Sequence, residues 1–218
     1  MKTSIDSLTS KEATLSILRP TKIVEQSAGV KEVSEGSDIT LECRAETDPK
    51  LQSSLEIKWL YNNQPLQDDS RVDPQGLNHI DIKIRSAKKS DTGFYQCVAS
   101  SSKDEDKSEI VQVIVRKKTT IKMSQDPVNA LEGDTATVKC DHDTDTELQD
   151  SLTIKWFKDG IELKKADRML RSPQELIIQN LQTSDTGSYN CKVSTKIDQI
   201  ESNPVILETY KNSKSASK

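Results

Sequence analysis

Two carboxylates stand in matching motifs. Asp91 and Asp185 each open an Asp-Thr-Gly triplet inside the longer pattern Ser-Asp-Thr-Gly-x-Tyr-x-Cys. A pair of such triplets could share one proton between two carboxyl groups, as in aspartic proteases. That chemistry needs an apolar strand running into each aspartate, and here Lys88-Lys89-Ser90 and Gln182-Thr183-Ser184 precede them. We therefore expect a structural role for both aspartates and no catalytic residue.

A second acidic pattern follows the third cysteine, with carboxylates at Asp141, Asp143, Asp145 and Glu147. Alternating carboxylates begin the EF-hand calcium loop, which also needs glycine at its sixth and glutamate at its twelfth position. Thr146 and Leu152 stand there instead. We interpret the stretch as a solvated loop and leave weak calcium binding open.

The two histidines, His79 and His142, have no cysteine neighbour at metal-ligand spacing. No serine lies in a Gly-x-Ser-x-Gly context, so nucleophilic catalysis has no support. The sequence therefore predicts no enzyme, no cofactor and no metal site other than the weak calcium binding left open above.

Composition favours two small domains over one large one. Charged residues make up 30% of the 218 residues and aromatic residues 4%, which leaves little apolar material for a single core. Acidic residues outnumber basic ones by 35 to 31, so nucleic acid is not expected as a partner. No run reaches the roughly 18 to 20 apolar residues that span a bilayer, so we expect no membrane insertion in this segment.

The chain contains an internal repeat. A shift of 97 residues aligns Cys43 with Cys140, Trp59 with Trp156 and Arg71 with Arg168. A shift of 94 residues then aligns Asp91 with Asp185, Tyr95 with Tyr189 and Cys97 with Cys191. Two copies of one domain are predicted, over residues 21–116 and 117–209.

Each copy reads as short strands with one apolar face and no convincing helical period. In the first copy the apolar alternations are Ile39-Leu41-Cys43-Ala45, Leu55-Ile57-Trp59-Tyr61, Ile80-Ile82-Ile84, Tyr95-Cys97-Ala99 and Ile110-Gln112-Ile114. In the second they are Ala136-Val138-Cys140, Leu152-Ile154-Trp156, Leu176-Ile178, Tyr189-Cys191-Val193 and Val205-Leu207. The predicted fold class is all-β, with two sheets packed face to face in each copy.

The spacing Cys…Trp…Asp-x-Gly-x-Tyr-x-Cys resembles the immunoglobulin superfamily, and the resemblance covers both halves from about Thr21 to Glu208 as tandem I-set-type, Greek-key sandwiches. It implies an inter-sheet disulfide between Cys43 and Cys97 and another between Cys140 and Cys191, with Trp59 and Trp156 packed on the bridges. It also implies a tyrosine corner at Tyr95 and Tyr189. Asp91 would pair with Arg71, and Asp185 with Arg168.

The junction from Val111 to Ile121 has no Gly/Ser linker, so the two copies should form a short rod. Ala13 to Ile23 reads like the same junction. We therefore interpret residues 1–20 as an extension that carries the last strand of an earlier domain, and a missing signal peptide and anchor as consequences of excision. Residues 210–218 are expected to form a disordered polar tail.

The joint between the copies should bring opposite charges together. The loop from Asp141 to Asp150 is expected at the end of the second copy that faces the first. The basic residues at the facing end of the first copy are Lys88, Lys89, Arg116, Lys117 and Lys118. Our hypothesis is that these charges fix the angle between the domains.

Two loops, Asp48-Pro49-Lys50-Leu51 and Asp145-Thr146-Glu147-Leu148, resemble the Asp-Pro-x-Leu loop in membrane-distal repeats of the L1/neuroglian and contactin families. Val193 to Ser202 and the junction from Ala13 to Ile23 resemble late immunoglobulin domains of the same families. The resemblance implies an extracellular module that binds other proteins, either a cell-surface receptor or a second copy. Two alternatives remain: a secreted immune protein like hemolin, and a cytosolic muscle tandem like titin or twitchin. Four cysteines, all at bridge positions, favour an oxidising compartment.

Partner contacts are predicted at the outer end of the first copy because loops carry recognition more often than core strands. The residues that we expect there are Asp48, Leu51, Asp104, Glu105 and Asp106.

Overall fold

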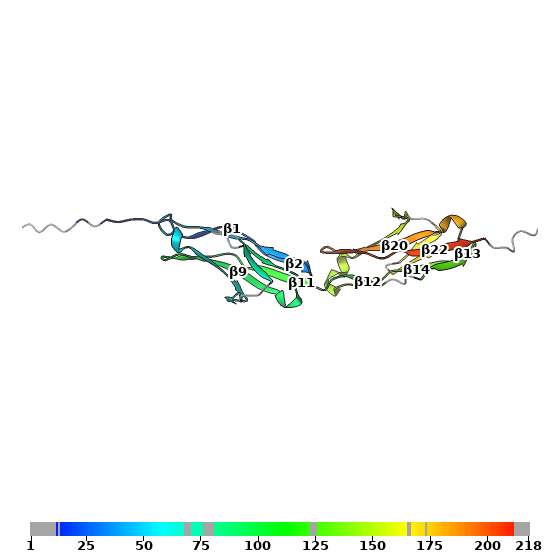
Figure 1. Cartoon of the computed structure of the whole chain (residues 1–218), viewed down its shortest axis with the longest axis horizontal. Helices are drawn as coiled ribbons and strands as arrows, with labels where there is room; N and C mark the ends of the chain where they lie inside the picture. The colour runs from blue at the N-terminus through cyan, green and yellow to red at the C-terminus, as the bar shows by residue number, and fades with distance from the viewer. Residues whose placement is uncertain are drawn as a thin grey trace, which may run out of the picture.

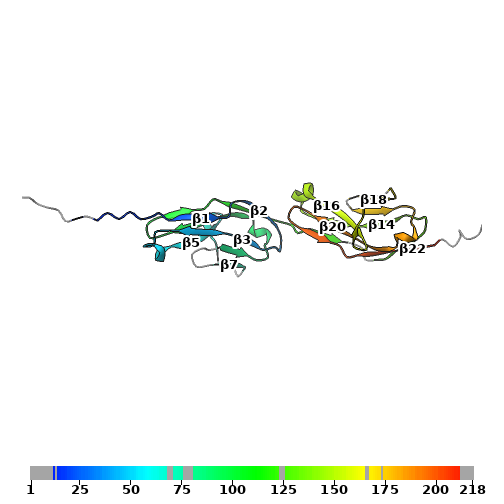
Figure 2. The same cartoon turned by 90° about the horizontal axis from the view of Figure 1, so that it is seen from above.

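The computed structural model describes residues 12, 14–67, 71–75, 81–122, 126–164, 167–172 and 174–211. Within these ranges the chain folds into two β-sandwiches that lie end to end (Figures 1 and 2). The helical elements of the described ranges are four 3-10 segments: η1 (Gln52–Ser54), η2 (Lys89–Asp91), η3 (Thr146–Ser151) and η4 (Thr183–Asp185). The predicted all-β fold is confirmed.

The first sandwich packs one long sheet against a split one. The long sheet has the order β2 (Gly29–Ser34), β11 (Val111–Arg116), β9 (Gly93–Ser100), β5 (Glu56–Tyr61) and β6 (Gln64–Pro65), with β10 (Glu105–Lys107) beside β9. The opposite sheet consists of β1 (Lys22–Gln26) with β4 (Cys43–Glu46), and of β3 (Ile39–Leu41), β8 (Asp81–Ile84) and β7 (Val72–Gln75). Strand β2 runs parallel to β11, whereas the other pairs are antiparallel.

The second sandwich repeats this topology. Its long sheet has the order β13 (Val128–Leu131), β22 (Val205–Tyr210), β20 (Gly187–Ser194), β16 (Thr153–Lys158) and β17 (Ile161–Glu162), with β21 (Gln199–Glu201) beside β20. Opposite lie β12 (Thr120–Lys122) with β15 (Asp141–Asp143), and β14 (Ala136–Lys139), β19 (Glu175–Ile178) and β18 (Met169–Arg171). Strand β22 reaches Tyr210, one residue past the predicted domain end. The predicted tail of residues 210–218 therefore begins too early, and residues 212–218 lie outside the described residues.

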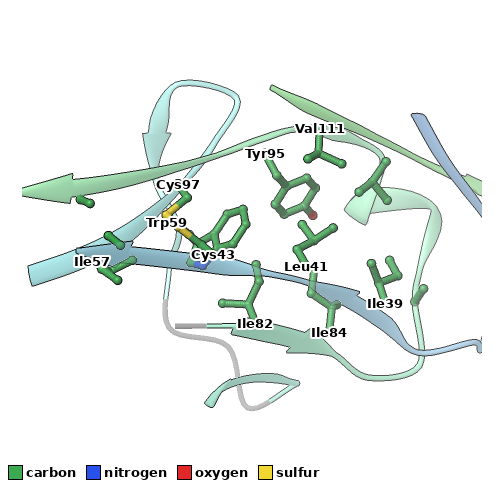
Figure 3. Packing of buried hydrophobic residues seen from close by; sticks show 14 of the residues in the cluster. Ile39, Leu41, Cys43, Ile57, Trp59, Ile82, Ile84, Tyr95, Cys97 and Val111 are labelled. Carbon is green, nitrogen blue, oxygen red and sulfur yellow. A yellow bond between two sulfur atoms is a disulfide. The ribbon is translucent and has the colours of Figure 1, made fainter. Parts of the chain in front are cut away.

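Each core is built around a disulfide and a tryptophan. Cys43 bonds Cys97 and Cys140 bonds Cys191, with sequence separations of 54 and 51 residues, so both predicted bridges are confirmed. Trp59 is the cross-strand neighbour of Cys97 and lies beside the first bridge (Figure 3). In the chain-entropy account, closing a loop of this length stabilises each sandwich by about 4 kcal/mol.

The predicted inner face of the last strand in the first copy is wrong. Ile110, Gln112 and Ile114 were expected to face the core, yet the buried residues are those between them: Val111, Val113 and Val115. Nearly every residue of this strand is apolar, so alternation alone cannot choose a face. The buried face is set by a register shift along β9. Lys107 of β10 pairs with Val98 of β9, but Val111 of β11 pairs with Tyr95 of β9.

Candidate interaction surfaces

The Asp-Thr-Gly motifs form two structural corners, one in each sandwich. The Tyr95 hydroxyl donates to the Asp91 carbonyl at 2.9 Å, and the Tyr189 hydroxyl donates to the Asp185 carbonyl at 2.7 Å. Burial is the first cause that raises the pKa of both tyrosines above their usual range, and the nearby aspartate carboxylate adds to it. Both phenols therefore stay protonated and serve as hydrogen-bond donors.

Each aspartate carboxylate at a corner has an arginine partner. Arg71 donates to Asp91 at 2.8 and 3.0 Å, and Arg168 donates to Asp185 at 3.1 and 3.3 Å. Backbone N–H groups of Lys88 and Gln182 also donate to these carboxylates. Burial opposes ionisation of Asp185, but the Arg168 and Gln182 bonds outweigh it and lower the pKa of this carboxyl. An ion-paired carboxylate in each separate sandwich is unsuited to sharing a proton with the other.

The glycine of each motif lies close to a side chain of the neighbouring strand. A β-carbon added to Gly93 would lie 2.3 Å from the Tyr61 ring, and one added to Gly187 would lie 2.6 Å from Cε of Lys158. The repeated triplet is thus explained by packing, pairing and capping.

At the outer end of the first sandwich, Asp104 and Asp106 hold the incoming chain. Asp104 accepts the Thr21 N–H at 2.9 Å and the Thr21 hydroxyl at 2.6 Å, while Asp106 accepts the Ile23 N–H at 2.8 Å. Asp48 accepts the N–H groups of Lys50 and Arg19 at 3.0 and 3.1 Å, and these two bonds lower its pKa.

The other two predicted contact residues differ from each other. Leu51 is only 8% exposed, so its side chain packs inward. Glu105 is exposed and lies 3.5 Å from Lys107. A partner contact at this end stays a prediction, and Glu105 is the exposed carboxylate in the predicted set whose side chain does not anchor the first strand.

The sequence reasoning missed that this anchor occurs twice. In the second sandwich Asp198 accepts the Thr119 N–H and hydroxyl, both at 2.9 Å, and Thr119 contacts the Thr144 hydroxyl at 2.8 Å. Thr21 contacts Thr47 in the same way at 3.0 Å. We call these groups the threonine latches: Thr21, Thr47 and Asp104, and Thr119, Thr144 and Asp198. The repeat shifts carry Thr47 onto Thr144 and Asp104 onto Asp198, but Thr21 and Thr119 are 98 residues apart, and the shifts alone do not show that the three residues meet.

The joint brings charges from both sandwiches together. Arg116 donates to Glu32 at 2.9 Å and lies 3.9 Å from Asp145. Lys117 pairs with Asp143, and Lys196 of the second sandwich pairs with Glu32 of the first. Hydrogen bonds from Lys196 and then Arg116 lower the pKa of Glu32. Arg116 and Lys117 therefore meet the acidic loop as expected, and Lys196 is an added basic partner.

The calcium-like run belongs to this joint. Lys117 engages Asp143, and the backbone N–H groups of Lys117 and Glu147 engage Asp145 at 3.1 Å each. Among the described residues, no group of three or more His, Cys, Asp or Glu side chains is placed to hold a metal ion.

The long sheet of the first sandwich exposes apolar side chains on its outer side. Val30, Gln112 and Phe94 are direct cross-strand neighbours on β2, β11 and β9. Val30 is 63% exposed, Phe94 is 52% exposed, and Ile110, two residues before Gln112, is 52% exposed. We call Val30, Phe94 and Ile110 the outer apolar face. Ser188 and Pro204 replace Phe94 and Ile110 in the second copy.

Comparison with known proteins finds one family in both halves. The model of the immunoglobulin I-set domain matches residues 22–115 and 119–205. Papilin of Mus musculus is 32% identical over 169 residues, covering 75% of this chain and 12% of papilin. Neural cell adhesion molecule L1 of Rattus norvegicus is 29% identical over 194 residues, covering 86% of this chain and 14% of L1. Contactin-6 of Rattus norvegicus is 27% identical over 175 residues, covering 77% and 16%.

Solved structures share the fold. Extracellular domains 3–5 of Drosophila OTK align with a TM-score of 0.62 at 18% identity, covering 90% of this chain and 63% of that one. The I-band fragment I67–I69 of titin aligns with a TM-score of 0.61 at 17% identity, covering 88% and 66%. Among the described residues, no helix is long and apolar enough to cross a bilayer.

Proposed function

The chain belongs to the immunoglobulin I-set family, and on that premise we propose that it is a protein-binding segment of an extracellular adhesion or recognition protein. The observation that carries the proposal is the use of cysteine. All four cysteines form inter-sheet disulfides, which persist in oxidising compartments and are rare in the cytosol. The names of two relatives, neural cell adhesion molecule L1 and contactin-6, support the same direction.

The compartment has a direct test. Native material from its source, denatured without reductant and titrated for thiols, should show no free thiol. Four free thiols per chain would place the protein in a reducing compartment and favour a cytosolic structural tandem instead.

For binding, the outer apolar face is the surface that we propose. Exposed Val30, Phe94 and Ile110 bury apolar area when a second protein covers them, and exposed apolar side chains gathered on one face mark contact sites. Glu105 pairs with Ser100 at the other end of β9 from Phe94, so it stays a separate predicted contact. Weak single contacts of this type gain strength when several chains are presented together.

The binding proposal is tested with beads coated with the chain. The beads are mixed with cells from the source organism to detect a cell-surface partner, and with each other to detect binding between two copies of the chain. Phe94→Ser and Ile110→Ser should each weaken binding by about tenfold or more because each removes a large exposed apolar side chain of the face. Ile161→Ser is the matched control, since Ile161 is 74% exposed in the second sandwich. If both face variants bind as the wild type does, while thermal unfolding shows them folded, the face is not the contact.

A further inference from the structure

The segment before the first sandwich has the pattern of a strand that lacks its sheet. Leu15 and Ile17 are each 89% exposed and alternate with Thr14, Ser16 and Leu18. In both views the segment leads away from the first sandwich (Figures 1 and 2). Alternating aliphatic residues serve a half-buried strand, so in this position they have nothing to pack on.

Register identifies which strand the segment resembles. Leu15 and Ile17 precede Thr21 by the same spacing as Val113 and Val115 precede Thr119. Val113 and Val115 are both 0% exposed in the first core, and Leu207, at the position that matches Val113, is 0% exposed in the second. Leu15 and Ile17 therefore stand at core positions of a last strand.

The sequence before this segment continues the match. The shift of 98 residues that carries Leu15 onto Val113 also carries Thr3 onto Ser101, Asp6 onto Asp104 and Ser10 onto Ser108. A shift of 192 residues carries the same three onto Thr195, Asp198 and Ser202. Residues 3 to 10 lie outside the described residues, so this comparison is one of sequence.

The matched positions have fixed tasks in both sandwiches. Ser101 and Thr195 donate to the latch aspartates. Ser108 and Ser202 accept the N–H of Cys97 and Cys191 at 2.9 and 3.0 Å. The pattern thus marks the closing hairpin of this type of sandwich.

The outer end of the first sandwich binds the chain segment before it in the same way as the second sandwich binds the segment at the joint. Asp48 accepts the Arg19 N–H at 3.1 Å, and Asp145 accepts the Lys117 N–H at 3.1 Å. Arg19 and Lys117 stand at equal spacing before the two latch threonines. At the joint, the first sandwich occupies the receiving site of the second. Within the described residues, the receiving site of the first sandwich is in contact with the incoming chain but with no preceding sandwich.

We propose that a third sandwich of the same kind precedes Thr21, with residues 14–18 as its last strand, and that it seats on the outer end of the first sandwich. This inference goes beyond the proposed function because it does not depend on what the chain binds. At the outer end the exposed Lys50 and Lys103 take the places of Glu147 and Ile197. The outer end of the first sandwich is therefore more basic at these two positions than its counterpart at the joint.

The reading frame of the natural transcript gives the first test. It should place a Tyr-x-Cys that ends two residues before residue 1, with a tryptophan and another cysteine further upstream. An in-frame stop codon just before Met1, or an upstream sequence without this pattern, would overturn the proposal.

The second test compares the 218-residue chain with the longer natural chain. The double substitution Leu15→Ser and Ile17→Ser should leave unfolding of the short chain unchanged, since both side chains are exposed there. In the longer chain it should lower the Tm of one additional transition by more than about 10 °C. Thr14→Ser with Ser16→Thr is the control, which should change neither chain.

A readout without substitutions covers the case in which the double variant fails to fold. Backbone amides of residues 14–18 should exchange freely in the short chain and be protected in the longer one. Fast exchange at these amides in both chains, or equal sensitivity to the double substitution, contradicts the proposal.

Discussion

At the scale of single residues, the corner shows how a motif that could do chemistry is used for packing. The Asp91 carboxylate accepts Arg71 and the Lys88 N–H, its carbonyl accepts Tyr95, and Gly93 admits the Tyr61 ring. Each group is thereby occupied by a partner of its own domain. Reactivity needs an available group, and this arrangement leaves none for a substrate.

Removing one phenol oxygen should destabilise its sandwich. Tyr95→Phe leaves the buried Asp91 carbonyl without its donor, so the free energy of unfolding should fall by about 1 to 3 kcal/mol. Denaturant titration measures the loss. Tyr210→Phe is the control, because Tyr210 is 51% exposed. The free energy of unfolding should fall much less in this variant. An equal fall in the free energy of unfolding in both variants would show that the buried Tyr95–Asp91 hydrogen bond stabilises the fold no more than an exposed one.

The Asp185 carboxyl should make the second sandwich sensitive to acid. Its pKa in the folded chain lies below the ordinary value because the Arg168 and Gln182 bonds outweigh its burial. Such a group stabilises the fold above its unfolded pKa of about 3.9, and that stability is lost as the pH falls through the folded pKa.

Asp185→Asn should therefore be less stable at pH 7, by about 1 to 3 kcal/mol, and should lose less stability between pH 5 and pH 2. Thermal unfolding across that pH range measures both effects. Asp150→Asn, at an exposed position, is the control. An unchanged acid profile in the Asp185 variant would contradict the assignment.

At the scale of elements, the sequence predicts strands well where a cysteine or tryptophan marks the inner face. It fails at β11, because Val111 to Val115 are apolar except Gln112 and either face could be buried. The deciding feature is the Ser108 hydroxyl, which accepts the Cys97 N–H and accompanies the register shift. Such a contact depends on two strands already being paired, so local pattern does not reveal it.

The threonine latches were also hidden, because Thr21 and Asp104 are separated by 83 positions. Aspartates in loops usually read as solvated, and only the paired geometry shows that Asp104 and Asp198 tie the first strand to the closing hairpin. The outer apolar face was missed for a related reason, since Val30 and Phe94 come from different strands and Ile110 precedes β11. A sequence pattern shows how residues are spaced along the chain, but it does not show which residues become neighbours across a sheet.

Loss of one latch hydroxyl should loosen the start of the second sandwich. Thr119 is 1% exposed, and Thr119→Val keeps its shape while depriving Asp198 and Thr144 of a partner. We expect the free energy of unfolding to fall by about 1 to 3 kcal/mol, as for other buried polar groups left unpaired. Thr137→Val on β14, at an exposed position, is the control. Equal stability of Thr119→Val and wild type in denaturant titration would exclude the latch.

At the scale of the whole molecule, the joint is where charged side chains of the two sandwiches meet. Glu32 is shared by Arg116 of its own sandwich and Lys196 of the next, and Arg116 also approaches Asp145. Three residues separate β11 from β12, which leaves little free chain. Our hypothesis that these charges set the angle between the domains follows from this geometry.

Salt should therefore broaden the distribution of interdomain angles. Screening lengths fall from about 30 Å at 0.01 M to 3 Å at 1 M ionic strength, so exposed pairs weaken across that range. Small-angle scattering should show a wider distance distribution at high salt, and Glu32→Gln should show it already at low salt. Glu56→Gln, which loses a pair remote from the joint, is the control. A distribution unchanged by salt and by Glu32→Gln would remove the hypothesis.

The parallel pairing of β2 with β11 has a mechanical consequence. Tension applied along the rod would pull these two strands in opposite directions, so the ladder from Gly29 to Ser34 would be loaded in shear, with its bonds sharing the force. After rupture the disulfides would still retain the chain between their cysteines. At ~3.4 Å per residue, the separations of 54 and 51 residues withhold about 180 and 170 Å of extension. A tether made of such units would resist a sudden pull and then yield only in short steps.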